Sequence, residues 1–110
     1  MLELAIRLIH WGMKRSEAIA KLKAAAPGIR IRGARSLYLF GPAARDKMTP
    51  KSDLDIFIDV ANPDTFSLIE LVDIKFYLER ALGVEVDVTT RDSLHPMLRQ
   101  DIEQSAIRIF

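Results

Sequence analysis

The 110-residue chain contains no cysteine. This absence excludes disulfide bonds, thiolate metal ligands and a cysteine nucleophile, and it fits the reducing cytoplasm in which we expect the protein. Hydrophobic runs are also short, far below the roughly 18 residues that a membrane-spanning helix needs. No basic segment precedes the first apolar residues, so the N-terminus lacks the pattern of a signal peptide. We therefore expect a protein with no membrane contact.

The chain has little net charge, because 16 Lys and Arg residues nearly balance 15 Asp and Glu residues. The two signs are nevertheless unevenly distributed. Residues 1–51 hold 11 basic and 3 acidic residues, whereas residues 52–110 hold 5 basic and 12 acidic residues. Such a division either places a basic rim beside an acidic centre, as a site for metal and polyphosphate requires, or is a chance distribution over solvated faces.

The first third of the chain has the apolar spacing of helices. One helix is expected over residues 2–11, ended by Gly12, and another over about 17–26. Ser16 is the expected N-cap of the second helix, and Pro27-Gly28 is its expected end.

Three later segments have the pattern of β-strands, at residues 37–40, 53–60 and 84–89. A long amphipathic helix is expected between the second and third strands, capped by Asn62 or Asp64 and ended by Gly83. A last helix is expected after Ser93 or the Leu94-His95-Pro96 turn, and His95 is interpreted as part of that turn.

This order of elements favours an α+β fold, in which a small mixed β-sheet has helices packed on one face. No repeat or linker divides the chain. We therefore expect one domain over residues 1–110, with a helical N-terminal part at 1–33 and a core at 34–110.

Three aspartates share one predicted face of the sheet, with Asp53 and Asp55 on one strand and Asp87 on another. The simple explanation is that solvent-facing positions accept any polar residue. However, Asp is disfavoured in strands, and carboxylates about 4 Å apart cost on the order of 4 kcal/mol per pair at an effective dielectric near 20. Mg²⁺ removes this repulsion because it prefers carboxylate oxygens. Two such ions can activate an attacking oxygen and stabilise a leaving pyrophosphate.

A glycine-containing loop precedes the first two aspartates. Gly41 ends the first predicted strand, and a helical turn after it would expose backbone N–H groups that favour phosphate. Arg45, Lys47 and Lys51 lie in the same loop. A phosphate-binding turn followed by a metal-binding pair is the layout expected for nucleotidyl transfer.

These motifs resemble the signature of the minimal nucleotidyltransferases (MNT) of the DNA polymerase β superfamily. That signature is Gly-Ser, ten residues, Asp-x-Asp, and a third Asp on a later strand. Here Gly41 and position 42 are followed by ten residues and then by Asp53-Leu54-Asp55. Further residues match the family's usual pattern, namely Ala44, Arg45, Ser52 and Asp87.

The resemblance covers about residues 34–107 and implies the polymerase β-like nucleotidyltransferase fold. It implies that Asp53 and Asp55 hold two Mg²⁺ ions together with a nucleotide, and that Asp87 completes one metal site and orients or deprotonates the acceptor hydroxyl. The glycine lets the backbone approach the triphosphate of ATP or another nucleoside triphosphate. The implied nucleotide-binding residues are Gly41, Pro42, Ala43, Arg45 and Ser52, with Arg45 either structural or facing phosphate.

Two positions depart from the family pattern. Pro42 replaces a serine whose hydroxyl and N–H group face the phosphates, and proline offers neither donor. Losing such hydrogen bonds costs roughly 1.5–3 kcal/mol each, although the N–H groups of Ala43 and Ala44 remain available. Asp46 replaces the usual glycine after Ala-Arg and adds a negative charge near the phosphates.

The resemblance implies that the chain transfers AMP from ATP to a hydroxyl, often of a tyrosine on a HEPN-domain ribonuclease toxin, and so acts as an antitoxin. The alternative is a catalytically impaired protein that neutralises a HEPN partner by complex formation alone. Expected partners are a HEPN toxin or another helical subunit, in a homo- or hetero-oligomer. No DNA-binding module is recognisable, so no DNA partner is expected.

Overall fold

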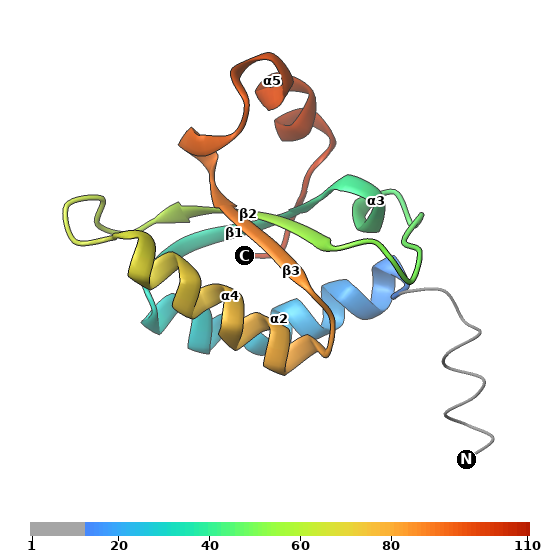
Figure 1. Cartoon of the computed structure of the whole chain (residues 1–110), viewed down its shortest axis with the longest axis horizontal. Helices are drawn as coiled ribbons and strands as arrows, with labels where there is room; N and C mark the ends of the chain where they lie inside the picture. The colour runs from blue at the N-terminus through green and yellow to red at the C-terminus, as the bar shows by residue number, and fades with distance from the viewer. Residues whose placement is uncertain (1–12) are drawn as a thin grey trace.

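The computed structural model of the chain describes residues 13–110. Four strands form one sheet in the order β3-β2-β1-β4 (Figure 1). β1 runs antiparallel to β2 and β4, while β3 runs parallel to β2. The strands span Ala34–Phe40 (β1), Leu54–Val60 (β2), Val86–Thr90 (β3) and Ile107–Arg108 (β4). The predicted small mixed sheet of an α+β fold is therefore confirmed, while β4 was not predicted because two residues carry no alternation.

The first described helix, α2, runs from Arg15 to Ile31. The prediction that Ser16 caps this helix is wrong, because Lys14 holds the N-cap position and makes no side-chain cap bond. The prediction that Pro27-Gly28 ends it is also wrong, because the helix continues through both residues. The helix predicted over residues 2–11 lies outside the described residues.

Packing against the next long helix explains why α2 continues past its local breakers. A Cβ atom at Gly28 would overlap the side chain of Tyr77, so glycine lets the two helices approach closely. The Gly28 carbonyl accepts a hydrogen bond of 2.9 Å from Arg32 Nη1, and the Arg32 guanidinium lies 3.9 Å from the centre of the Tyr77 ring. Tertiary contacts of this kind override helix propensity.

The second long helix, α4, runs from Leu68 to Leu82 and begins later than predicted. Neither Asn62 nor Asp64 caps it. Ser67 does, through a capping box in which the Ser67 hydroxyl accepts from the Ile69 N–H and Glu70 accepts from the Ser67 N–H. Its predicted end is confirmed, since Gly83 adopts the left-handed conformation with φ of 74°.

α2 and α4 lie side by side on one face of the sheet and enclose the core with it (Figure 1). The alternation of β2 puts its apolar side chains on this face, opposite the buried stripes of both helices. The fully buried side chains of the core include Leu22, Ile29, Leu37, Leu39, Leu54, Ile56, Ile58, Ile74 and Leu78. Within residues 13–110, none of the helices combines the length and apolarity required to cross a membrane.

The last helix, α5 (Pro96–Ser105), lies on the other side of the sheet (Figure 1). The short 3₁₀ helix η1 (Arg91–Ser93) leads to it from β3. As predicted, His95 belongs to the turn before α5, where its Nδ1 accepts the Met97 N–H at 3.2 Å. The opposite face of the sheet is thus partly covered, and Phe57 is fully buried there, stacked on Tyr38 with ring centres 4.6 Å apart.

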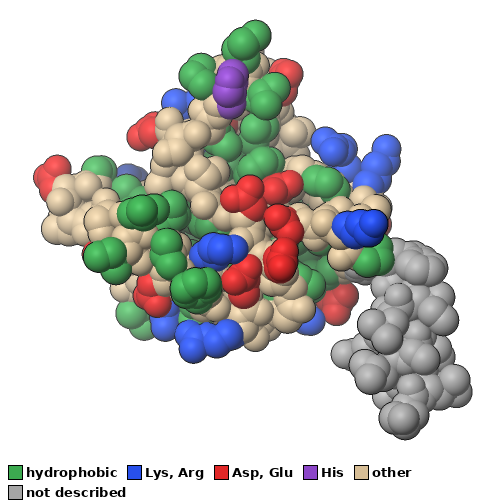
Figure 2. Space-filling view, viewed as in Figure 1, with side chains coloured by type: hydrophobic (Ala, Val, Ile, Leu, Met, Phe, Trp, Pro, Cys, Tyr) green, Lys and Arg blue, Asp and Glu red, His purple; other side chains and the backbone are tan. Residues whose placement is uncertain are grey.

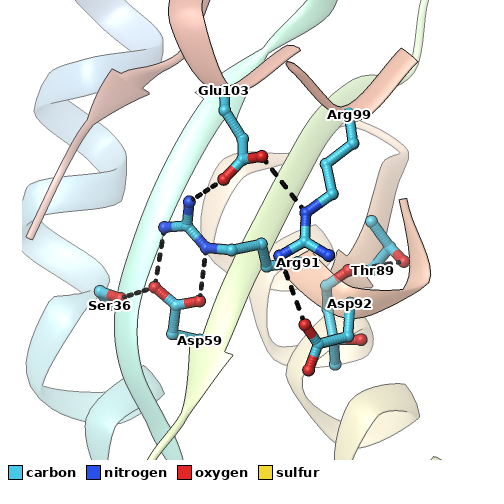
Figure 3. A network of polar contacts seen from close by, with 8 residues as sticks. Ser36, Asp59, Thr89, Arg91, Asp92, Arg99 and Glu103 are labelled. Carbon is cyan, nitrogen blue, oxygen red and sulfur yellow. Dashed lines mark hydrogen bonds and ion pairs between the residues drawn. The ribbon is translucent and has the colours of Figure 1, made fainter. Parts of the chain in front are cut away.

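An ion-pair network holds this last segment to the sheet (Figure 3). The Arg91 guanidinium donates from Nε and Nη2 to both carboxylate oxygens of Asp59, at 2.8 and 2.9 Å. Its third nitrogen, Nη1, donates to Glu103 of α5 at 2.5 Å. Ser36 of β1 donates to the same Asp59 carboxylate at 2.6 Å. One arginine therefore joins β2 and α5, and through Asp59 also β1.

Candidate active site

Gly41 and Asp55 lie in direct contact, although fourteen positions separate them. Gly41 begins the short helix α3 (Gly41–Ala44) with φ of 71°, in the left-handed region that favours glycine. A Cβ atom at this position would overlap the carboxylate of Asp55. The antiparallel register explains the contact, since Phe40 pairs with Asp55 across β1 and β2. The fold therefore brings the predicted glycine loop against the predicted carboxylate pair at Asp55.

The three predicted carboxylates lie on two neighbouring strands or directly before one of them. Asp55 and Asp87 are register partners in the parallel pair β2 and β3, whose backbones are about 4.8 Å apart in such ladders. Asp53 directly precedes β2 and is exposed. The expectation that the third acid comes from a neighbouring strand with the same facing is confirmed.

The electrostatics of the site are concentrated on Asp55. Partial burial, followed by the negative charges of Asp87 and Asp53, raises the pKa of Asp55 to about 6, while the Arg45 charge opposes the rise. Figure 2 shows acidic side chains gathered near the middle of the face in view. Burial and mutual repulsion both disfavour the charged form of Asp55, and a nearby cation would favour it.

A divalent cation fits the chemistry of these donors. Carboxylate oxygens are hard ligands that suit Mg²⁺, and a cation would relieve the repulsion that raises the Asp55 pKa. Among the described residues, however, no group of three or more His, Cys, Asp or Glu side chains is arranged to hold a metal ion as it stands. The side chains of Asp53, Asp55 and Asp87 must therefore converge further to share one ion.

Pro42 occupies the first turn of α3, where its fixed φ suits a helix and its missing N–H removes no helical bond. The Pro42 carbonyl accepts the N–H groups of Arg45 at 3.2 Å and Lys47 at 2.7 Å, which closes the turn. The Ala43 side chain is fully buried and packs into the hydrophobic core, which holds the loop against it. The proline therefore preserves the shape of the loop while removing a donor from it.

Asp46 also has a structural explanation. Its φ of 57° lies in the left-handed region. The glycine that the family usually has at this position would adopt this conformation easily, and Asp tolerates it better than most residues do. Its carboxylate accepts the backbone N–H of Arg15 at 2.8 Å, at the start of α2. A negative charge is favourable at a helix N-terminus, so this carboxylate is engaged by α2.

The remaining predicted nucleotide-binding residues lie at the rim of the site. Ser52 belongs to a tight turn, where its hydroxyl is 3.0 Å from the Thr49 hydroxyl and accepts the Thr49 N–H at 3.1 Å. Arg45 is exposed and contributes its charge to Asp55. A cavity of about 340 Å³ opens beside Asp53, between the loop before β2 and the turn from α4 to β3.

Sequence reasoning missed Lys75 and Glu79 of α4, which bond to the backbone of β3 next to Asp87. Their spacing of four residues on a predicted helix was a readable signal of an ion pair. The contact with β3 was not readable, because it depends on how α4 docks against the edge of the sheet.

The family described as Nucleotidyltransferase domain matches residues 29–109. The chain belongs to this nucleotidyltransferase family. Its members generally use a divalent metal ion. The shared region contains the contact between Gly41 and Asp55 as well as the partner strand with Asp87.

Named relatives of this nucleotidyltransferase include protein adenylyltransferases. One from Methanocaldococcus jannaschii is 38% identical over 76 residues, which cover 68% of this chain and 76% of that protein. Protein adenylyltransferase MntA of Thermococcus cleftensis is 27% identical over 77 residues, covering 70% of this chain and 76% of that protein.

Solved structures place the nucleotidyltransferase among MNT folds. A structure described as a minimal nucleotidyltransferase is 29% identical, with a TM-score of 0.75, and the match covers 86% of this chain and 95% of that one. An MNT antitoxin in complex with a tri-AMPylated HEPN toxin from Shewanella oneidensis has a TM-score of 0.58 at 21% identity, covering 80% of this chain and 68% of that one. The second likeness concerns the fold alone.

Proposed function

We propose that this nucleotidyltransferase is a Mg²⁺-dependent protein adenylyltransferase. It transfers AMP from ATP to a tyrosine hydroxyl of a HEPN-domain ribonuclease toxin and thereby acts as its antitoxin. The observation that carries this proposal is the contact between Gly41 and Asp55, beside the register pair of Asp55 and Asp87. It joins a phosphate loop to an acidic centre, as nucleotidyl transfer requires.

The relatives support the choice of AMP and of a protein acceptor. Two relatives that are 38% and 27% identical to the chain carry the name of protein adenylyltransferases. A solved structure with the same fold contains a tri-AMPylated HEPN toxin together with its MNT antitoxin, and another toxin–antitoxin structure contains AMP-PNP.

Each site residue has a defined task in the proposed reaction. Asp53 and Asp55 would hold two Mg²⁺ ions, Asp87 would contribute to one of these sites, and Gly41 would leave room for the triphosphate. When bound, the ions supply charge neutralisation at the phosphates and activation of the attacking oxygen. Asp87 orients the tyrosine hydroxyl and accepts its proton as the oxygen attacks the α-phosphorus. The bond from the α-phosphorus to the bridging oxygen breaks, and pyrophosphate leaves.

The loop and its surroundings bind the nucleotide in this proposal. The N–H groups of Ala43 and Ala44 face the phosphates in place of the donors that Pro42 lacks, and Arg45 adds positive charge at the rim. Ser52 approaches the nucleotide from the end of the loop. The cavity beside Asp53 offers adjoining space of about 340 Å³, a volume in the range of small-ligand sites.

The proline at position 42 supports a second candidate function, in which the chain retains the fold and binds its HEPN partner without transferring AMP. In this case the missing phosphate donors make turnover negligible, and neutralisation follows from complex formation. The two candidates share the fold and the partner, so only chemistry separates them.

The test is to incubate the purified chain with Mg²⁺, ATP labelled at the α-phosphate and a HEPN-domain protein from the same genome. We expect label on the HEPN protein, none with γ-labelled ATP, and none with the Asp53→Asn/Asp55→Asn variant. The double variant Asp64→Asn/Asp101→Asn makes the same charge change at two exposed positions away from the site and serves as the control. A stable inhibitory complex without label transfer would reject the enzyme in favour of the binding protein.

A further inference from the structure

The position of Asp87 depends on the open edge of the sheet. Within residues 13–110, β3 has a strand neighbour on one side only, because it is the end strand next to β2. The Glu85 carbonyl accepts the Leu54 N–H at 2.9 Å, so the polar groups of Val86, the next residue, point away from β2. Edge groups of this kind have no partner within the sheet. The polar groups of Val86, directly before Asp87, are therefore available to partners outside the sheet.

Two side chains of α4 bond to both of these edge groups. Lys75 Nζ donates to the Val86 carbonyl at 2.7 Å, and Glu79 Oε2 accepts the Val86 N–H at 3.0 Å. The two side chains also pair with each other at 2.9 Å. The Val86 carbonyl belongs to the peptide unit that joins Val86 to Asp87, so α4 holds the chain immediately before the third carboxylate.

We propose that Lys75 and Glu79 form a clamp that positions Asp87 for its role in the site. The inference rests on the proposed function, because it assigns the clamp to a carboxylate of that site. Both are positioning residues, since their charged groups contact the backbone of β3 and each other. By fixing the peptide unit between Val86 and Asp87, the clamp would set the position of the Asp87 side chain beside Asp55, where the proposed cation would bind.

A purely electrostatic role for Lys75 predicts the opposite effect on metal binding. The hydrogen bond to Glu79 is the largest cause that raises the pKa of Lys75, and the charges of Asp53 and Asp87 add to it. By Coulomb's law, removing a cation near two carboxylates strengthens the binding of another cation. Loss of positioning weakens that binding. The sign of the change therefore separates the two roles.

The experiment compares three variants of the full chain. Lys75→Met removes the donor but keeps an unbranched side chain with good helix propensity, and Lys75→Arg supplies a donor again. Lys21→Met is the matched control, because Lys21 forms the same type of pair with Glu17 on α2, at 3.4 Å. The readouts are a Mg²⁺ titration followed by amide NMR signals of residues 53–55 and 87, and hydrogen exchange at the Asp87 amide.

We expect Lys75→Met to bind Mg²⁺ roughly tenfold more weakly, as is typical when a group that orients metal ligands is lost. The Asp87 amide should exchange faster than in wild type, Lys75→Arg should restore both properties, and Lys21→Met should change neither. In AMP transfer, kcat should fall while KM for ATP stays near the wild-type value, because Asp87 acts on the acceptor.

The proposal is overturned if folded Lys75→Met binds Mg²⁺ as tightly as wild type or more tightly. Unchanged exchange at the Asp87 amide would overturn it as well. These readouts are independent of catalysis. If the wild-type chain transfers no AMP, the proposed function fails while the titration and the exchange still decide on the clamp, and if it binds no Mg²⁺ the exchange alone decides.

Discussion

At the scale of single residues, Asp55 is the carboxylate whose negative charge the proposed chemistry needs and the fold disfavours. Burial and two neighbouring negative charges raise its pKa to about 6 from a usual value of 3.8. The folded chain therefore binds this proton more tightly than the unfolded chain. The resulting contribution to stability is complete below about pH 4 and is lost as the pH rises through about 6.

This sign gives a prediction for Asp55→Asn. In metal-free buffer at pH 7.5 the variant should be more stable than wild type, by on the order of 1–2 kcal/mol after allowance for partial exposure. The difference should shrink as the pH falls toward 4, because wild type then carries the proton. Urea unfolding across this pH range measures both effects, with Asp64→Asn on an exposed loop as control. A variant less stable than wild type at pH 7.5 would contradict the assignment.

Pro42 gives the second prediction at this scale. Pro42→Ser restores an N–H group and a hydroxyl in the first turn of α3, and each hydrogen bond to a charged phosphate contributes roughly 1.5–3 kcal/mol. ATP should therefore bind about ten- to a hundredfold more tightly, as measured by calorimetry with Mg²⁺ present. Pro63→Ser makes the same exchange in an exposed loop that does not line the cavity beside Asp53 and should leave the affinity unchanged. Equal ATP affinity in both variants would place the nucleotide away from Pro42.

At the scale of elements, the contact of α2 with α4 gives a third prediction. Gly28→Ala raises helix propensity by about 1 kcal/mol, but its Cβ overlaps the Tyr77 side chain. We expect net destabilisation of about 1–3 kcal/mol in wild type, in the range typical of overpacking. In a Tyr77→Leu background the overlap disappears, so the same change should become stabilising. Chemical denaturation of the four proteins measures the cycle, and an unchanged sign would contradict close packing at Gly28.

The Arg91 network gives the prediction for the last segment. The side chains of Arg91, Asp59 and Glu103 are 24%, 32% and 31% exposed. Arg91→Met should therefore lower the free energy of unfolding by about 1–3 kcal/mol at pH 7, which is less than the loss from breaking a fully buried ion pair. Hydrogen bonds from Arg91 are the largest cause that lowers the pKa of Asp59 and of Glu103. Their contribution is therefore present above the ordinary carboxylate range and is lost as the pH falls through it.

The stability gap between wild type and Arg91→Met should thus narrow as the pH falls from 6 to 3. Urea unfolding at both ends of this range measures the gap. Arg108→Met is the control, since this exposed residue of β4 makes no ion pair among the described contacts. A gap that stays constant with pH would show that Arg91 acts through packing on Tyr38 and Phe57 alone.

Elements governed by local patterns were predictable from the sequence, and those governed by docking were not. The alternation around Ile56 and the position of Gly83 locate β2 and the end of α4. The end of helix α2 was not predictable from local patterns, because the effect of Gly28 depends on Tyr77, which is far away in sequence. Strand β4 was not predictable either, since its two residues form a strand by pairing with Tyr38 and Leu39 of β1.

The candidate site divides in the same way. The spacing of Gly41 and Asp55 was enough to predict that a loop and a carboxylate pair act together, and their contact agrees with it. The raised pKa of Asp55 was not predictable in size, because it depends on burial and on the distance to Asp87. The role of Asp46 at the start of α2 was also hidden, since only the folded chain brings Arg15 to it.

At the scale of the whole molecule, the fold places aspartates of the acidic second half of the sequence beside a loop of the basic first half. Asp53, Asp55 and Asp87 come from this half, while Arg45 and Lys51 come from the basic half. In the proposed function these residues bind metal and nucleotide, and a partner protein supplies the acceptor hydroxyl.

The most direct measurement is therefore the intact mass of a HEPN-domain protein after incubation with the chain, Mg²⁺ and ATP. We predict a mass increase equal to one or more AMP units, located on tyrosine by fragmentation, and no increase with Asp87→Asn. The adduct should also end the toxicity of the HEPN protein after the chain has been removed. An unmodified HEPN protein, still inhibited while the chain is bound and active again after its removal, would contradict nucleotidyl transfer and leave only binding.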